Sequence, residues 1–85
     1  MGNELKIADN MIYIEEGSNI LAMVEFKKIS PTEYDIYHTF VDEKLRGQGI
    51  ASTLVGKAVK EISSRGYKVQ ASCSYANAWL KKRNI

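Results

Sequence analysis

Two glycines one residue apart, Gly47 and Gly49, follow Arg46 and stand directly before a stretch with helical periodicity. The first N–H groups of a helix have no partner inside the helix, and they point outward with the positive end of the helix dipole. Glycines allow positive φ angles and let an anion approach the backbone closely. This combination is typical of a site that binds a phosphate or pyrophosphate. The alternative is a tight turn into a helix with no ligand.

Two well-known nucleotide motifs do not fit this loop. Gly47 to Ser52 nearly matches the dinucleotide fingerprint, but Ser52 replaces the third glycine. A Rossmann unit also has an acidic residue near the end of the next strand, where this chain has Ser72, Cys73 and Ser74. The Walker A pattern fails because no Gly-Lys-Ser/Thr follows at the required spacing.

His38 is the only histidine of the chain. In an alternating strand it shares a face with Ile36 and Phe40, and a histidine on an apolar face is usually a hydrogen-bonded core residue. Its neutral imidazole could also take a proton from an ammonium group. The sequence leaves both interpretations open.

Cys73 is the only cysteine, so it cannot form an internal disulfide, which fits a reducing compartment and a cytoplasmic protein. It shares a strand face with Val69 and Ala71, where a free cysteine commonly acts as a small apolar residue. It also stands just before an expected helix, and the field of a helix N-terminus favours a reactive thiolate.

The elements that must position these residues follow from periodicity and turn signals. We expect strands at residues 11–17, 19–29 and 33–41, a helix that begins after Gly49 and ends before Gly66, a strand at 67–73, and a helix at 75–83 capped by Ser74. The first three strands predict an antiparallel meander. The strand–helix–strand unit that follows predicts a crossover to a parallel neighbour. The fold class is therefore α/β (α+β), with a mixed sheet and a C-terminal helix.

The length, the net charge and the apolar stretches of the sequence exclude several classes of protein. With 85 residues, we expect residues 1–85 to form a single domain. A net charge of +2 is too weak to indicate a nucleic-acid partner. No apolar stretch of about 18 residues is present to span a membrane, and the N-terminal residues do not resemble a signal peptide. We expect no metal site.

The segment from Arg46 to Ala51 resembles the coenzyme A loop of the GNAT superfamily of N-acetyltransferases, whose pattern is Arg/Gln-x-x-Gly-x-Gly/Ala. The similarity covers most of the chain and is strongest from His38 to Tyr75. The triplet Cys-Ser-Tyr at 73–75 resembles that of small, single-domain GNAT-like proteins. These proteins keep the acetyl-coenzyme A half of the fold and lack the usual helices between the first two strands. In one departure, Ala71-Ser72 stand where relatives often have a proline before the cysteine.

The resemblance implies acetyl-coenzyme A (or coenzyme A) as cofactor and assigns residues to it. It implies that the pyrophosphate is held by the N–H groups of Gln48, Gly49, Ile50 and Ala51, that Arg46 and Gly47 shape the turn, and that the pantetheine arm runs beside Thr39, Phe40 and Val41. It further implies an oxyanion-binding N–H near Phe40 or Val41.

The activity implied is acetyl transfer to an amine acceptor, either a small molecule or a protein. His38 is a candidate base, and Tyr75 or Cys73 is a candidate donor to the leaving thiolate. Alternatively, Cys73 first takes the acetyl group itself. The rival hypothesis is a non-catalytic module that binds acetyl-coenzyme A or a protein, because so short a chain leaves little surface for an acceptor pocket. We expect a monomer or weak dimer.

Overall fold

A computed structural model describes residues 4–84 and contains a five-stranded sheet in the order β1-β2-β3-β4-β5. The strands are β1 (Lys6–Ile7), β2 (Met11–Glu16), β3 (Asn19–Ser30), β4 (Glu33–Val41) and β5 (Lys68–Ala71). The helices are α1 (Ile50–Ser64) and α2 (Ser74–Lys82), and a short 3₁₀ turn, η1 (Glu43–Leu45), follows β4. β1 to β4 pair antiparallel and β5 pairs parallel with β4, so the predicted meander and mixed sheet are confirmed.

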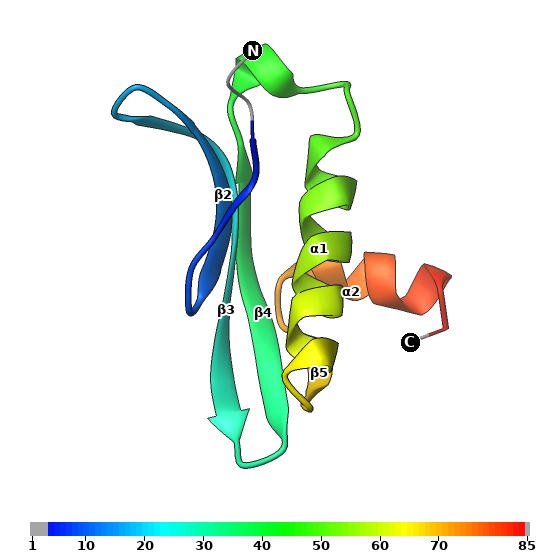
Figure 1. Cartoon of the computed structure of the whole chain (residues 1–85). Helices are drawn as coiled ribbons and strands as arrows, with labels where there is room; N and C mark the ends of the chain where they lie inside the picture. The colour runs from blue at the N-terminus through cyan, green and yellow to red at the C-terminus, as the bar shows by residue number, and fades with distance from the viewer. Residues whose placement is uncertain (1–3, 85) are drawn as a thin grey trace.

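The helix α1 lies along one face of the sheet, and α2 packs beside it (Figure 1). The core fills the space between the sheet and the helices. Its largest fully buried side chains are Ile12, Val24, Phe26, Ile36, Leu54, Val55 and Ile62. They come from β2, β3, β4 and α1, so the helical periodicity of α1 places one apolar stripe against the sheet. Neither described helix combines the length and apolar character that a membrane crossing requires.

A β-bulge in β4 changes which side chains face the core. Glu25 pairs with His38 while the next residue, Phe26, pairs with Ile36, so Tyr37 is an extra residue on β4. An extra residue reverses the alternation of the side chains that follow it. Ile36 is buried, whereas His38 is exposed on the opposite face of the sheet. The prediction that His38 shares a face with Ile36 is therefore wrong.

The strands β4 and β5 separate partway along the sheet. They pair from Glu33–Lys68 to Ile36–Ala71, but β4 continues to Val41. At the point of separation, the carbonyl oxygen of Ile36 accepts hydrogen bonds from the N–H groups of Ser72 (3.1 Å) and Cys73 (3.2 Å). Among the described residues, the part of β4 after Ile36 has β3 on one side and no strand on the other. A gap thus opens beside this half of β4.

The start of α2 differs from the prediction. Cys73, with extended φ and ψ of −69° and 126°, is the N-cap, and Ser74 is the first helical residue. No side chain caps this helix. The tertiary contact of the Cys73 N–H with Ile36 holds Cys73 in the extended conformation, so the helix begins one residue earlier than a Ser74 cap requires.

One strand was not expected from the sequence. The two-residue strand β1 pairs with β2, where the Lys6 ammonium contacts the Glu15 carboxylate at 2.8 Å.

Gly56, the glycine inside α1, lies where α1 approaches α2. A Cβ placed there would lie 3.3 Å from the Trp79 ring.

Candidate functional site

The loop before α1 depends on two glycines in the left-handed region. Gly47 has φ of 82° and Gly49 has φ of 73°, and Gly49 is the N-cap of α1 with no side-chain cap. This conformation costs an ordinary L-residue about 1–2 kcal/mol. A Cβ added at either glycine would meet no atom within 4 Å. The backbone of the loop is therefore open to an approaching ligand.

The N–H groups at the start of α1 are available to an anion. The first bond that closes the helix runs from the N–H of Thr53 to the oxygen of Gly49, at 3.1 Å. None of the residues 4–84 accepts a hydrogen bond from the N–H groups of residues 48–51. A pocket of about 150 Å³ lies here, and the loop, Val41, Ser52 and Tyr75 line it. Free donors beside a pocket at a helix N-terminus can hold a phosphate.

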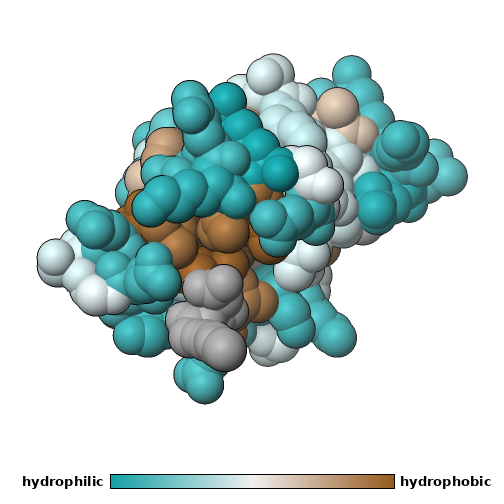
Figure 2. Space-filling model, turned by 90° about the horizontal axis from the view of Figure 1, so that it is seen from above, coloured by the Kyte–Doolittle hydropathy of each residue, from teal (hydrophilic) through white to brown (hydrophobic). Residues whose placement is uncertain are grey.

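Side chains fix the loop against the end of β4. The Arg46 Nε donates to the carbonyl oxygen of Val41 at 3.3 Å, and the Gln48 amide donates to the carbonyl oxygen of Lys44 at 3.4 Å. The Asp42 carboxylate accepts from the Lys44 N–H at 2.9 Å. The hydrogen bond of Arg46 to Val41 therefore stabilises the turn through its side chain. Figure 2 looks down on this end of the molecule, where hydrophobic residues show between hydrophilic ones.

The backbone of β4 offers hydrogen-bonding groups to the gap. The Asp42 N–H donates to the carbonyl oxygen of Leu21 on the β3 side. Because alternate residues direct their backbone groups to opposite sides of a strand, Phe40 also faces β3, while Val41 and Thr39 face the gap. The resemblance implies an oxyanion-binding N–H near Phe40 or Val41. Of these two N–H groups, only the Val41 N–H points toward the gap.

Cys73 lies where the gap closes. Its side chain is half-buried and packs against the core. Its Sγ lies 3.7 Å from the Oγ1 of Thr39, so the side chains of Cys73 and Thr39 lie on the same face of the sheet. The Cys73 carbonyl oxygen accepts from the Asn77 N–H at 2.8 Å. The thiol is thus held beside the free edge of β4.

Asp35 is the one charged residue among residues 4–84 that is buried, with 5% of its surface exposed. Its two carboxylate oxygens accept from the N–H of Ser72 (2.8 Å) and from the Ser72 hydroxyl (2.7 Å). The Gln70 amide adds a longer bond at 3.4 Å. The Asp35 carboxylate thus holds Ser72, the residue before Cys73, against β4 through these hydrogen bonds. Sequence reasoning missed Asp35, although an acidic residue inside an apolar strand was a usable signal.

We expect Asp35→Ala to lower the free energy of unfolding by about 2–3 kcal/mol, because it leaves the Ser72 donors without a partner. The change is measured by urea denaturation. Asp9→Ala is the matched control, because its exposed side chain should change stability by less than about 0.5 kcal/mol. Equal stability of the two variants would show that the buried carboxylate does not hold β5 to β4.

The structure separates the remaining catalytic candidates. Tyr75, which is 42% exposed, lines the loop pocket together with Ser52. His38 lies on the opposite face of the sheet from Thr39, because Thr39 pairs with the buried Val24 and His38 pairs with Glu25. The fold therefore brings Cys73 to Thr39 and Tyr75 to the loop, and it does not bring His38 to the thiol.

Comparisons with known proteins agree on one family. A model of the GCN5-related N-acetyl-transferase family matches residues 11–84. A solution structure of a GCN5-like protein from Staphylococcus aureus is 32% identical, with a TM-score of 0.80, and the match covers 98% of this chain and 82% of that one. No curated protein matches the chain.

Longer structures share the fold. An N-acetyltransferase from Staphylococcus aureus Mu50 is 25% identical, with a TM-score of 0.63, and the match covers 87% of this chain and 50% of that one. A predicted acetyltransferase from Clostridium acetobutylicum, solved with acetyl-CoA, is 22% identical, with a TM-score of 0.62 and coverage of 88% and 56%. The chain thus spans about half the length of these two proteins. With its family model, its loop and its sheet in agreement, the chain belongs to the GCN5-related N-acetyltransferases.

Proposed function

We propose that the protein binds acetyl-coenzyme A and transfers its acetyl group to an amine. One observation carries the proposal: Val41 at the end of β4 lines the loop pocket, and two residues back along the free edge of β4 the Thr39 Oγ1 lies 3.7 Å from the Cys73 Sγ. Coenzyme A has the matching chemistry, since a pyrophosphate is joined to a long arm that ends in sulfur. The Clostridium acetobutylicum protein solved with acetyl-CoA shares this fold.

In this proposal the loop binds the pyrophosphate and β4 binds the arm. The N–H groups of residues 48–51 donate to the phosphate oxygens, and Arg46 and Gly47 keep the loop in shape. The backbone of Thr39 and Val41 pairs with the amide groups of the arm. Val41 also lines the loop pocket, so its N–H serves the part of the arm next to the pyrophosphate.

Acetyl-coenzyme A, when bound, supplies an activated thioester carbonyl. In direct transfer the amine nitrogen attacks the carbonyl carbon, the carbon–sulfur bond breaks, and Cys73 or Tyr75 gives a proton to the departing thiolate. The proton that the amine releases goes to water, because His38 lies on the opposite face of the sheet from Thr39. In the two-step route, the Cys73 thiolate attacks the same carbon, the carbon–sulfur bond of the thioester breaks, and the coenzyme A thiolate leaves and takes a proton from Tyr75 or water. The amine nitrogen then attacks the acetyl carbon on Cys73, loses its proton to water and releases the Cys73 thiolate.

The lone thiol also suggests where the protein works. A catalytic cysteine must remain reduced, which favours the cytoplasm. We therefore propose a cytoplasmic enzyme that acts on a small-molecule or protein amine.

The proposal predicts that an amine stimulates the release of free coenzyme A from acetyl-coenzyme A. The assay uses polyamines, amino acids and peptides with free N-termini or lysines, and mass spectrometry identifies the acetylated product. At least one amine should raise the rate of release well above the rate without protein. Coenzyme binding without acetylation of any amine would instead support the binding-module hypothesis, and absence of binding would reject both.

A further inference from the structure

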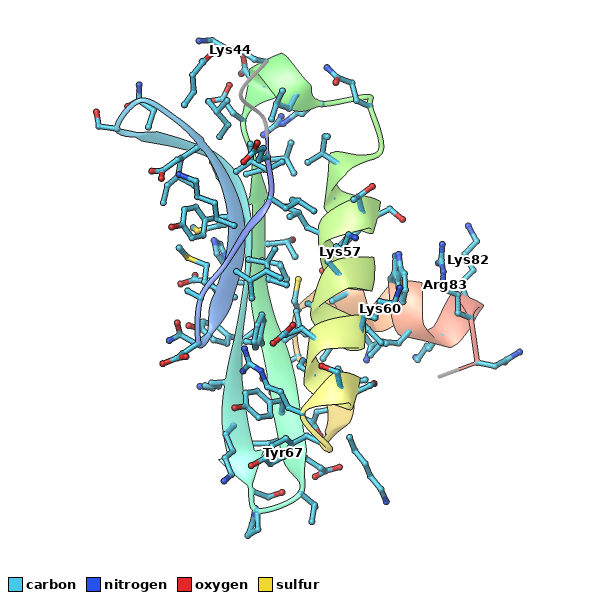
Figure 3. The ribbon with its side chains drawn as sticks, in the orientation of Figure 1. Lys44, Lys57, Lys60, Tyr67, Lys82 and Arg83 are labelled. Atoms are coloured by element: carbon cyan, nitrogen blue, oxygen red, sulfur yellow. The ribbon has the colours of Figure 1, made fainter. Side chains whose placement is uncertain are left out.

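The segment that ends in the thiol is held by β4. The chain from β5 to α2 passes beside the middle of β4 (Figure 3). The Asp35 carboxylate accepts the N–H and the hydroxyl of Ser72, at 2.8 Å and 2.7 Å. The carbonyl oxygen of Ile36 accepts the Cys73 N–H at 3.2 Å. Two adjacent residues of β4 thus hold Ser72 and Cys73 in place.

The helix α2 holds the same segment from its other side. The Asn77 N–H donates to the carbonyl oxygen of Cys73 at 2.8 Å, and the Asn77 amide donates to that of Ala71 at 3.2 Å. Between these bonds, the half-buried thiol lies 3.7 Å from the Oγ1 of Thr39. The direction of the Cys73 side chain therefore depends on a backbone that is fixed on both sides of it.

The buried carboxylate is better suited to precision than to stability. Burial of a carboxylate costs free energy unless cations or donors compensate it. The partners of Asp35 found within residues 4–84 are neutral donors of Ser72 and Gln70, and neither ion pair found there includes it. A carboxylate can, however, accept two donors of one residue in short, directional bonds. Asp35 therefore fixes the position of Ser72.

We propose that Asp35 is a positioning residue for the Cys73 thiol. Its bonds to Ser72 hold the start of α2 so that the thiol faces Thr39 at the free edge of β4, where the proposed arm ends in sulfur. The role rests on the proposed function, in which Cys73 acts in acetyl transfer. A shift of about 1 Å can slow a reaction by about a hundredfold, whereas Asp35 is not among the residues that line the loop pocket. Its loss should therefore affect transfer and spare coenzyme binding.

Asp35→Asn tests the role with little change of shape. The Asn oxygen still accepts one donor of Ser72, but the Asn amide group cannot accept the other. The variant should lower kcat of acetyl transfer by about tenfold or more and change KM for acetyl-coenzyme A by less than about twofold. Without coenzyme, the Cys73 thiol should alkylate at least about threefold faster, because a released segment exposes it more often.

Two variants of Ser72 separate geometry from charge. Ser72→Ala keeps the Asp35 carboxylate and removes one of its donors, so it should lower kcat and speed alkylation as Asp35→Asn does. Ser72→Thr keeps the hydroxyl, so both rates should return to the wild-type level. If Asp35→Asn does not fold, the comparison of the two Ser72 variants decides the matter.

Ile12→Val is the matched control for stability. Ile12 is fully buried in β2, which pairs with neither β4 nor β5, so its shortening weakens the core away from the thiol. Both rates should stay at the wild-type level. Wild-type alkylation and kcat in Ser72→Ala, or equal changes in Ile12→Val, would overturn the inference and leave the proposed function intact. If the wild type acetylates no amine, the proposed function fails, and the alkylation rates still show whether Asp35 places the thiol.

Discussion

Gly49→Val is expected to weaken coenzyme A binding by about a hundredfold or more while the fold survives. Gly49 has φ of 73°, and a β-branched residue is strongly disfavoured there. Either the loop rearranges and turns its N–H donors away, or the side chain occupies the open space beside the loop. Both outcomes remove the hydrogen bonds to the pyrophosphate. Calorimetry with coenzyme A measures the loss, and circular dichroism monitors the fold.

The chain offers a matched control for this substitution. Gly17, between β2 and β3, also has a positive φ, 63°, and open space around it. Gly17→Val should carry a similar backbone strain, yet it should bind coenzyme A as the wild type does. Wild-type affinity in Gly49→Val would contradict the assignment of the loop as the pyrophosphate site.

Cys73→Ala should fold, bind coenzyme A with unchanged affinity, and transfer acetyl groups at least about a hundredfold more slowly. The thiol is half-buried beside Thr39 at the end of the free edge of β4, where the proposed arm ends in sulfur. Removal of its sulfur takes away the nucleophile or the proton donor without touching the loop. The rate of coenzyme A release with the best amine measures the effect.

Two further measurements decide how Cys73 acts. Mass spectrometry of the protein mixed with acetyl-coenzyme A, without amine, should show an acetyl group on Cys73 if the two-step route operates, and none if transfer is direct. Bound coenzyme A should also slow alkylation of the thiol. Equal alkylation rates with and without coenzyme would place Cys73 outside the site, and wild-type turnover of Cys73→Ala would leave Tyr75 as the catalytic candidate.

Local signals determined the elements and the position of the loop. Gly17 ends β2, Pro31 follows the end of β3, and Gly66 follows the end of α1 with φ of 89°. The apolar spacing of α1 likewise predicts which of its residues are buried, such as Leu54 and Ile62. These features depend on residues close in the chain, so the sequence alone was sufficient to predict them.

The face that His38 occupies depends on the pairing of β3 with β4. The bulge at Tyr37 moves His38 to the face opposite Ile36, and no local pattern in the sequence marks that shift of register. The start of α2 likewise depends on the hydrogen bond between the Cys73 N–H and Ile36. Alternation along one strand could therefore not predict either feature.

The candidate site also contains some features that local sequence determines and others that only the tertiary structure determines. The glycines of the loop could be read from the sequence, because a positive φ is a property of single residues. The contact of Cys73 with Thr39 and the bonds of Asp35 to Ser72 join residues 34 and 37 positions apart. The contacts of Trp79 in α2 with Ser52 and Gly56 in α1 likewise join separate helices. Only the packing of separate elements brings these groups together, so only the tertiary structure could place them.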